Sequence, residues 1–112
     1  AGWALPGGVC HRRESPSATC SRELREETGL EVDFTHVHPV FLVDPGMPHV
    51  HVLFRRDAKV GPAKAERRYR GEIRSTAWHD LAQLPSPMQA ITLLQLAAVG
   101  AIEARPTATW VG

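Results

Sequence analysis

Residues 15 to 29 carry both the start and the stop signal of one helix, and this segment constrains the fold more than any other. Ser15 is followed by Pro16. A serine hydroxyl can cap the free N–H groups of a first helical turn, and proline needs no N–H at the first helical position. Gly29 can take the left-handed conformation that closes a helix. The sequence therefore predicts a single helix between Ser15 and Gly29.

One face of this helix is acidic. Glu23, Glu26 and Glu27 stand at i, i+3 and i+4, a spacing that places side chains next to one another. Like charges at this spacing destabilise a helix, so they call for compensating positive charge, part of which Arg22 and Arg25 offer. Mg²⁺ or Mn²⁺ would supply the rest, since hard cations prefer carboxylate oxygens. Taken alone, the three glutamates are more typical of a solvated helix face.

The residues around these glutamates decide between the two interpretations. From Gly8 to Leu30 the sequence fits the pattern G-x5-E-x7-R-E-U-x-E-E-x-G-U, in which U is a bulky apolar residue. This segment resembles the Nudix box, and every fixed position is filled. The preceding Trp3 to Gly8 also resembles the strand and glycine turn that lead into the box in this family. The fixed positions are Gly8, Glu14, Arg22, Glu23, Leu24, Glu26, Glu27, Gly29 and Leu30.

The resemblance implies a metal-dependent enzyme that hydrolyses the diphosphate bond of a nucleoside diphosphate linked to another group. Glu26 and Glu27 match metal-ligand positions, and Glu23 matches a position that serves as ligand or general base. Arg22 matches the residue that holds Glu23 in place. Gly7 would offer its backbone carbonyl to the metal, because glycine lets the chain approach closely. The cofactor expected from the resemblance is Mg²⁺ or Mn²⁺.

Further positions of the resemblance have structural or open roles. Gly8 and Gly29 shape the backbone of the motif, and Glu14 stabilises the loop and helix electrostatically. Family members often carry a glutamate a few residues before a tryptophan in a late strand, as Glu72 and Trp78 do here. Glu72 is therefore a candidate ligand or base, with a solvated strand residue as the alternative.

The rest of the chain alternates short strands and one more helix. Trp3 to Leu5 fits the end of a strand, and β-branched and aromatic residues predict another over Val32 to Val43, interrupted at Pro39. Asp44-Pro45-Gly46 predicts a turn, and His49 to Arg55 alternates like a half-buried strand returning from it.

After this hairpin, Lys59 to Gly71 is a polar loop and Glu72 to Trp78 a short strand. Ser86-Pro87 repeats the serine-proline start of a second helix, which is expected to end at Ala98 or Val99. Its apolar residues fall on one face. We also expect Trp3 and Trp78 to pack in the core.

These elements predict a single α/β domain of the α+β type over residues 1–112. The resemblance implies a Nudix-like mixed sheet sandwiched between helices. Nudix domains usually place one or more strands ahead of the box, yet here the box begins at Gly8. We therefore expect that N-terminal strands are missing from the chain, or that a partner chain, such as a second copy in a homodimer, completes the sheet.

Two groups of residues are weaker candidates for binding. The cluster Arg67, Arg68, Tyr69 and Arg70 could clamp phosphates or stack on a base, or it could be a solvated loop. Two His-x-His pairs, His36 with His38 and His49 with His51, could meet across the hairpin as a metal site. Histidines on the open face of a sheet, or lining a nucleotide pocket, are the alternatives.

Composition and charge narrow the classes of protein to which the chain can belong. The chain has 112 residues, 43% of them hydrophobic and 22% charged, with a net charge of +1. It shows no secretory signal, no apolar run long enough to span a bilayer and no basic-aromatic nucleic-acid motif. Two cysteines, Cys10 and Cys20, without a paired spacing fit two reduced, packed thiols. We therefore expect a cytoplasmic protein that acts on a nucleotide-type small molecule, without a membrane or nucleic-acid partner.

The sequence leaves the substrate open between a nucleoside triphosphate and an ADP-ribose-like compound. It also leaves one alternative of another class, a Nudix-fold module that binds or senses a nucleotide without turnover. The complete set of Glu23, Glu26 and Glu27 favours the enzyme, because binding alone would not require all three carboxylates.

Overall fold

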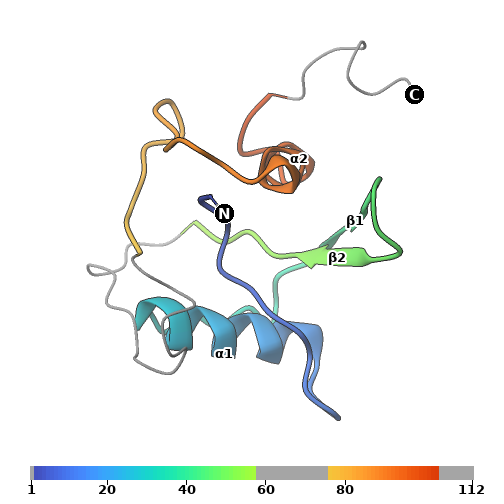
Figure 1. Cartoon of the computed structure of the whole chain (residues 1–112). Coiled ribbons are helices and arrows are strands. Elements are labelled where there is room, and N and C mark those ends of the chain that lie inside the picture. Colours follow the sequence, from blue (N-terminus) through green and yellow to red (C-terminus); the bar gives the residue numbers. More distant parts are fainter. Residues whose placement is uncertain (1, 58–75, 104–112) are drawn as a thin grey trace.

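The computed structural model of the protein describes residues 2–57 and 76–103, which form two helices and a β-hairpin (Figure 1). Helix α1 spans Pro16–Thr28 and helix α2 spans Ala90–Ala98. The strands are β1, Val40–Val43, and β2, Val50–Leu53. In Figure 1 the two helices lie on either side of the hairpin, and α2 contacts β1.

Helix α1 begins and ends where its capping residues predict. The Ser15 hydroxyl accepts a hydrogen bond from the Ala18 N–H at 3.2 Å, and Pro16 is the first helical residue. Gly29 has a φ of 75° and donates its N–H to the Arg25 carbonyl at 2.7 Å. The left-handed φ explains why a glycine ends this helix.

The hairpin is confirmed, but both strands are shorter than predicted, since β2 covers only Val50–Leu53 of the expected His49 to Arg55. β1 and β2 are antiparallel, with Val40 opposite Leu53 and Val43 opposite Val50. Residues 32 to 39 form no strand. The Asp33 carboxylate accepts a hydrogen bond from the Thr35 N–H at 2.9 Å, which closes a local turn and removes this segment from the extended conformation.

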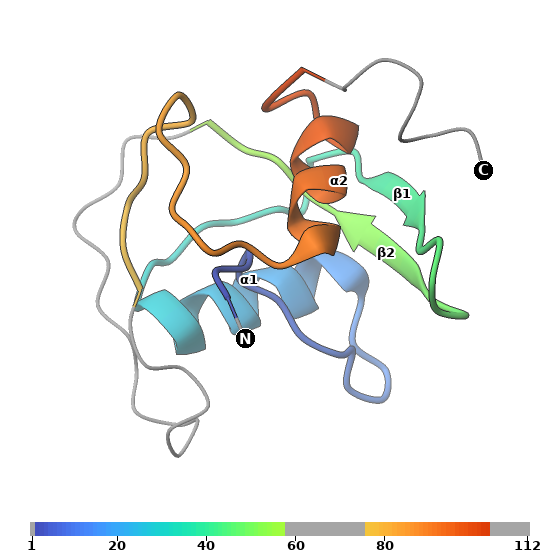
Figure 2. The same ribbon diagram turned by 45° about the horizontal axis from the view of Figure 1, so that its top comes forward.

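The predicted start of the second helix at Ser86-Pro87 is wrong. Helix α2 begins three residues later because residues 87 to 89 are paired with the N-terminal segment (Figure 2). The Trp3 N–H donates to the Pro87 carbonyl at 2.9 Å, and the Gln89 N–H donates to the Trp3 carbonyl at 3.0 Å. Backbone committed to this extended pairing cannot be helical. The predicted helix end is confirmed, with Val99 as the capping residue.

The predicted strands near the N-terminus and before Trp78 are not found as strands in the described residues. The expected strand end at Trp3 to Leu5 is reduced to a parallel bridge between Trp3 and Met88. Lys59 to Gly71 and residues 72 to 75 lie outside the described residues, and residues 76 to 78 are not in a strand. Trp78 is 60% exposed, so its prediction as a core residue is wrong.

Apolar burial is uneven across the described residues. Phe34 and Leu96 are buried, and the Phe34 ring lies 5.8 Å from that of Phe54. One face of the hairpin is open, because Phe41, Val43 and Val50 are all well over half exposed. No helix in the described part of the chain is both long enough and apolar enough to cross a membrane. Both cysteines are free thiols, and Cys10 is exposed rather than packed.

Candidate active site

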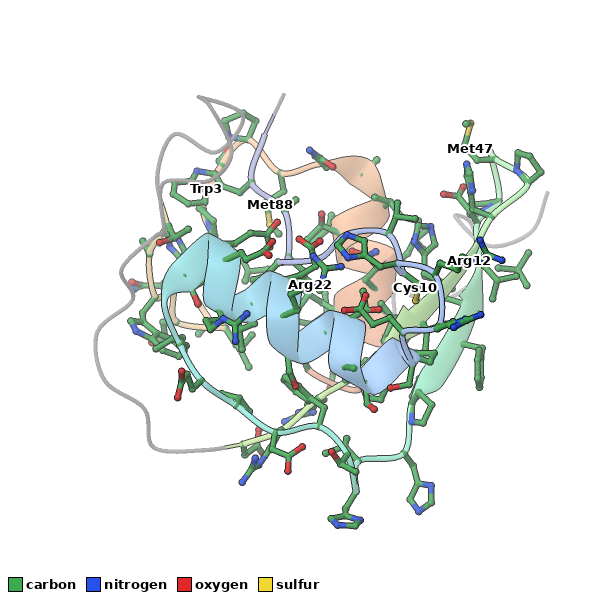
Figure 3. All side chains as sticks on the ribbon, turned by 90° about the horizontal axis from the view of Figure 1, so that it is seen from below. Trp3, Cys10, Arg12, Arg22, Met47 and Met88 are labelled. Carbon is green, nitrogen blue, oxygen red and sulfur yellow. The ribbon has the colours of Figure 1, made fainter. Side chains whose placement is uncertain are left out.

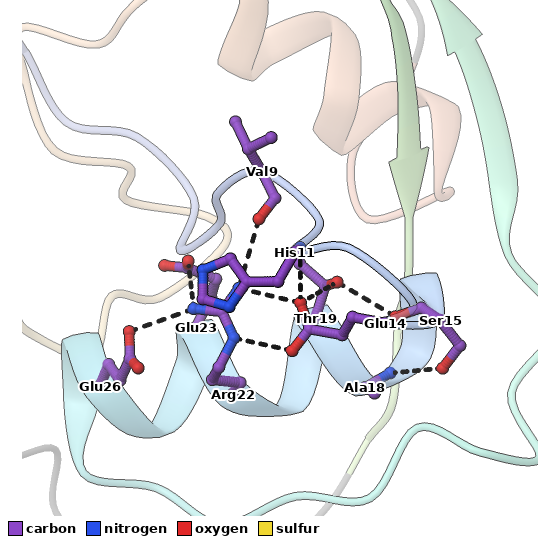
Figure 4. Close-up of polar contacts among 9 residues, drawn as sticks. All are labelled: Val9, His11, Glu14, Ser15, Ala18, Thr19, Arg22, Glu23 and Glu26. Carbon is purple, nitrogen blue, oxygen red and sulfur yellow. Dashed lines mark hydrogen bonds and ion pairs between the residues drawn. The ribbon is translucent and has the colours of Figure 1, made fainter.

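Arg22 stands at the centre of the acidic face of α1 and faces two ways (Figure 4). Its Nε donates to Glu14 Oε2 at 2.8 Å and its Nη2 donates to Glu14 Oε1 at 3.0 Å. On the other side, Nη1 lies 2.8 Å from Glu23 Oε1 and 3.3 Å from Glu26 Oε2. A planar guanidinium can serve several carboxylates at once because its N–H groups form a fixed fork. One cation therefore links the loop glutamate to two of the motif glutamates.

Glu14 is held by four donors, which explains its role in the local structure. Besides the two Arg22 contacts, it accepts from the Thr19 hydroxyl at 2.7 Å and from the His11 N–H at 3.0 Å. These hydrogen bonds, Arg22 first among them, hold the pKa of the Glu14 carboxyl far below its usual range. Arg22 also donates to the Val9 carbonyl at 3.2 Å, so the loop before α1 is fastened to the helix. Figure 3 shows Arg22 between α1 and this loop, which carries Cys10.

Glu23 is buried at 6% exposure and lies directly against Gly8. A Cβ atom added at Gly8 would overlap with the Glu23 carboxylate, whereas one added at Gly7 would meet nothing within 4 Å. A larger residue than glycine at position 8 would therefore force the Glu23 carboxylate to move. A buried carboxylate is retained in proteins only when it is paired, and Arg22 supplies that pairing.

Glu27 is a half-buried carboxylate of the cluster whose pKa is raised above its usual value. Burial, with a smaller contribution from the nearby charges of Glu23 and Glu26, raises the pKa of the Glu27 carboxyl to about 7. The hydrogen bond from the Gly7 N–H, at 2.8 Å, acts in the opposite direction. The Gly7 N–H thus donates a hydrogen bond to Glu27, whereas the role predicted from the sequence was metal binding by the Gly7 carbonyl. Because burial and two like charges disfavour the ionised carboxyl, a positive charge beside Glu27 would favour its ionised form.

The donor set of this region suits a hard divalent cation. It consists of carboxylate oxygens from Glu23, Glu26 and Glu27, without cysteine sulfur or imidazole among them. Within residues 2–57 and 76–103, however, no three such side chains already stand in an arrangement that could hold an ion together. Arg22 occupies the space between Glu23 and Glu26 through its two contacts.

The remaining predicted site residues either lie outside the described part of the chain or form no metal group within it. Glu72 and the cluster Arg67, Arg68, Tyr69 and Arg70 lie outside the described residues. The two His-x-His pairs form no metal group with other described residues. Instead, His51 Nε2 lies 2.9 Å from Asp44 Oδ2 at the end of the hairpin. Met47, at the tip of this hairpin, lies apart from Arg22 in Figure 3.

Thr19 belongs to the network although the sequence analysis did not single it out. Its side chain is buried, and its hydroxyl reaches Glu14. A signal was present in the sequence, because Thr19 precedes Glu23 by four positions and so shares its helix face. A polar β-branched residue there has no helix-forming advantage that would explain it.

Comparison with known proteins matches the chain to one family model and to several curated proteins. The family model described as NUDIX domain matches residues 1–98. A protein of Streptomyces rubellomurinus named CMP-5'-(N-acetyl-N-hydroxy-3-aminopropyl)phosphonate hydrolase is 31% identical over 84 residues, covering 71% of this chain. The chain spans 38% of that relative's length. No solved structure matches.

Proposed function

The chain belongs to the Nudix family, and from this premise we propose that it hydrolyses a phosphoric anhydride bond in a nucleotide-type substrate with the help of a divalent metal ion. The observation that carries the proposal is the seating of the Glu23 carboxylate over Gly8, beside Glu26 and Glu27 on one face of α1. Nudix enzymes generally use divalent cations, and we propose Mg²⁺ or Mn²⁺ here because all the available donors are hard oxygens.

Each carboxylate has a distinct part in the proposal. Glu23, Glu26 and Glu27 would hold the cation, together with the backbone carbonyl of Gly7. When bound, the cation would neutralise phosphate oxygens and increase the acidity of the attacking water. Glu27 supports this arrangement, since burial and, to a smaller extent, the charges of Glu23 and Glu26 raise the pKa of its carboxyl, and a bound cation would counter both effects. Glu72 stays a candidate for a further ligand or the base.

Arg22 would keep Glu23 in a productive orientation. Its Nη1 contact with Glu23 is 2.8 Å long, and the opposite edge of the guanidinium is fixed on Glu14. Because both sides of the guanidinium are held, Arg22 and Glu23 can pair in few other orientations. Side chains that orient ligands in this way typically change metal affinity or activity about 10- to 100-fold when removed.

The substrate proposal rests on two supports. The family acts on nucleoside diphosphate derivatives, and the named relative is a hydrolase of a CMP-linked phosphonate. A suitable panel therefore contains nucleoside triphosphates, ADP-ribose and a nucleoside monophosphate joined to a phosphonate. The cluster Arg67, Arg68, Tyr69 and Arg70 is proposed to contact the phosphates or the base of such a substrate.

The proposal is tested by turnover of this panel with Mg²⁺ or Mn²⁺, with products identified by phosphorus NMR. We expect Glu27→Gln to lower kcat by at least about 100-fold, because a direct ligand matters more than an orienting residue. Glu14→Gln is the matched control and should lose less activity, since Glu14 reaches the carboxylates only through Arg22.

The outcomes separate the enzyme from the binding module. Tight nucleotide binding without cleavage of any panel member, with either metal, would show that the chain is a non-catalytic sensor. Equal losses in Glu14→Gln and Glu27→Gln would show that Glu14 acts directly at the reacting group.

A further inference from the structure

Thr19 is a buried hydroxyl whose strongest contact is a carboxylate rather than the helix backbone. The residue is 5% exposed, and its Oγ1 lies 2.7 Å from Glu14 Oε1 and 3.1 Å from the Ser15 carbonyl (Figure 4). A hydroxyl has one hydrogen to donate. Hydrogen bonds to an ionised acceptor are shorter and stronger than neutral ones, so the hydrogen is directed at Glu14.

The position of Glu14 is transmitted to the motif carboxylates through a continuous chain of contacts. Glu14 Oε1 receives Thr19 together with Arg22 Nη2, and Glu14 Oε2 receives Arg22 Nε. Arg22 is thereby held along one edge by both carboxylate oxygens. Its remaining nitrogen, Nη1, reaches Glu23 at 2.8 Å and Glu26 at 3.3 Å. A rotation of the Glu14 carboxylate would therefore turn the guanidinium away from Glu23.

We propose that Thr19 is a positioning residue of the carboxylate site, whose hydroxyl fixes the Glu14 carboxylate so that Arg22 orients Glu23 and Glu26. This inference rests on the proposed function for its catalytic meaning. Thr19 acts through Glu14 and Arg22 and touches neither Glu23 nor Glu26 by any hydrogen bond in the described residues. Backbone geometry alone does not require it, because α1 has its own cap at Ser15.

If the Thr19 hydroxyl only satisfied the helix backbone, its removal should have the same effect as removal of the Thr28 hydroxyl from the same helix. Threonines in helices commonly bond the carbonyl four residues earlier, which satisfies the hydroxyl and has no further role. Thr28 does this, with Oγ1 2.6 Å from the Leu24 carbonyl, and it is as buried as Thr19. Thr28 also accepts from the Leu30 N–H, but it contacts none of the site carboxylates in the described structure. The two threonines lie on the same helix and differ in their link to Glu14.

The experiment compares Thr19→Val, Thr19→Ser and Thr28→Val with the wild-type chain. Valine keeps the branched shape and removes the hydroxyl, while serine keeps the hydroxyl. Three quantities are measured: the Kd of Mn²⁺ by calorimetry, the Arg22 Nε–H resonance and its exchange rate by NMR, and kcat on whichever panel substrate is cleaved. Thermal unfolding is recorded for each variant to separate loss of fold from loss of positioning.

We expect Thr19→Val to raise the Kd of Mn²⁺ about 10-fold, in the range of other residues that orient ligands, and to speed exchange of the Arg22 Nε–H. Thr19→Ser should restore both, and Thr28→Val should leave both at the wild-type level even if its unfolding temperature falls. A wild-type Kd and a wild-type Arg22 resonance in Thr19→Val would overturn the proposal. Equal effects in Thr19→Val and Thr28→Val would also overturn it.

Failure of this inference differs visibly from failure of the proposed function. If no panel member is cleaved, hydrolysis is excluded, but Mn²⁺ binding and the Arg22 resonance still decide the role of Thr19. If the wild-type chain is active and Thr19→Val matches it in all three measurements, only the inference is lost. If the wild-type chain binds no Mn²⁺, both are overturned.

Discussion

Gly8 is constrained by the side chain that lies against it. The Glu23 carboxylate fills the space that a Cβ at this position would occupy, and Arg22 and burial prevent it from moving freely. We therefore expect Gly8→Ala to displace Glu23. Since the displaced group is the end of a side chain rather than backbone, the change should lower activity by more than about 10-fold and stability by no more than about 1 kcal/mol.

Paired measurements of kcat and of the free energy of unfolding check this expectation. Gly7→Ala is the control, because its added Cβ meets nothing within 4 Å and its activity loss should be far smaller. An active Gly8→Ala variant would show that Glu23 can work from a second position.

At the level of single residues, the sequence predicted what depends on local rules. Ser15 and Gly29 cap α1 as expected, because capping is decided within one turn of chain. The sharing of Arg22 between Glu14 and two other glutamates was only partly predictable, since it requires the loop to fold back on the helix. Thr19 was missed because its role depends on that same contact.

The elements differ in how far their boundaries follow from local sequence. Helix α1 has a side-chain cap, whereas the N-cap residue of α2, Gln89, makes no side-chain cap hydrogen bond. The start of α2 is set by pairing with Trp3, which is more than eighty positions away along the chain. A serine-proline signal cannot reveal such a partner. The Asp33 turn shortened β1 in the same way, through a side chain whose alternative hydrogen bond outweighed the β-propensity around it.

Helix α2 contains a buried polar group without a partner, which gives a stability prediction. Thr92 is 1% exposed, and its Oγ1 has no hydrogen-bond partner among the described residues. Removing an unpaired buried hydroxyl relieves its desolvation penalty, so Thr92→Val should raise the free energy of unfolding by about 1 kcal/mol. Urea unfolding measures this. Thr28→Val should change stability in the opposite direction, because that hydroxyl is bonded to Leu24. A destabilised Thr92→Val would mean that the hydroxyl has a partner in solution.

The hairpin should show its own pH dependence through Asp44. The His51 side chain, followed by the Gly46 N–H, lowers the pKa of the Asp44 carboxyl below its ordinary value of 3.8. A lowered folded-state pKa means that the carboxylate stabilises the fold above the unfolded pKa, and this stabilisation is lost as pH falls through the folded pKa. The stability difference between wild type and Asp44→Asn should therefore be largest near neutral pH and shrink in acid.

Unfolding curves of wild type and Asp44→Asn, recorded between about pH 3 and pH 7 at intervals of about one unit, measure how the stability difference depends on pH. Asp57→Asn serves as the control, since the contact that Asp57 makes within residues 2–57 and 76–103 is an exposed one of 3.5 Å with Arg55. A stability difference that stays constant over the whole range would show that the Asp44 charge does not contribute.

For the whole molecule, the proposed cation should act as a stabilising ligand. A ligand that binds the folded state alone adds about 2.7 kcal/mol when its free concentration is 100 times its Kd. We therefore expect Mg²⁺ or Mn²⁺ to raise the Tm of the wild-type chain and EDTA to reverse the increase. Glu27→Gln should remove most of the increase, because it deletes one of the three carboxylates. A Tm that is insensitive to both metals would contradict the proposed metal site.

The sequence predicted the fold class of the molecule correctly, but it predicted a larger sheet than the described residues form. Family membership and the helix-hairpin arrangement fit the expected α/β fold, yet within the described residues the sheet has two strands. Two strands alone are marginally stable in water. The hairpin face that carries Phe41, Val43 and Val50 is also left open by so small a sheet. The periodicity of the sequence could not predict this exposure, because periodicity shows which residues share a face but not what covers that face.

The hydrogen bonds among the site residues described above join positions that are at most 20 apart in the chain, the longest being the one between Gly7 and Glu27. Segments with such local contacts can form and persist as cooperative units while other parts of a protein open. In native-state hydrogen exchange, the amides of α1 and of His11 and Glu14 should thus become exposed together. They should do so at a higher opening free energy than the amides of the hairpin, because the hairpin exposes Phe41, Val43 and Val50 on one face, so the carboxylate cluster outlasts the sheet.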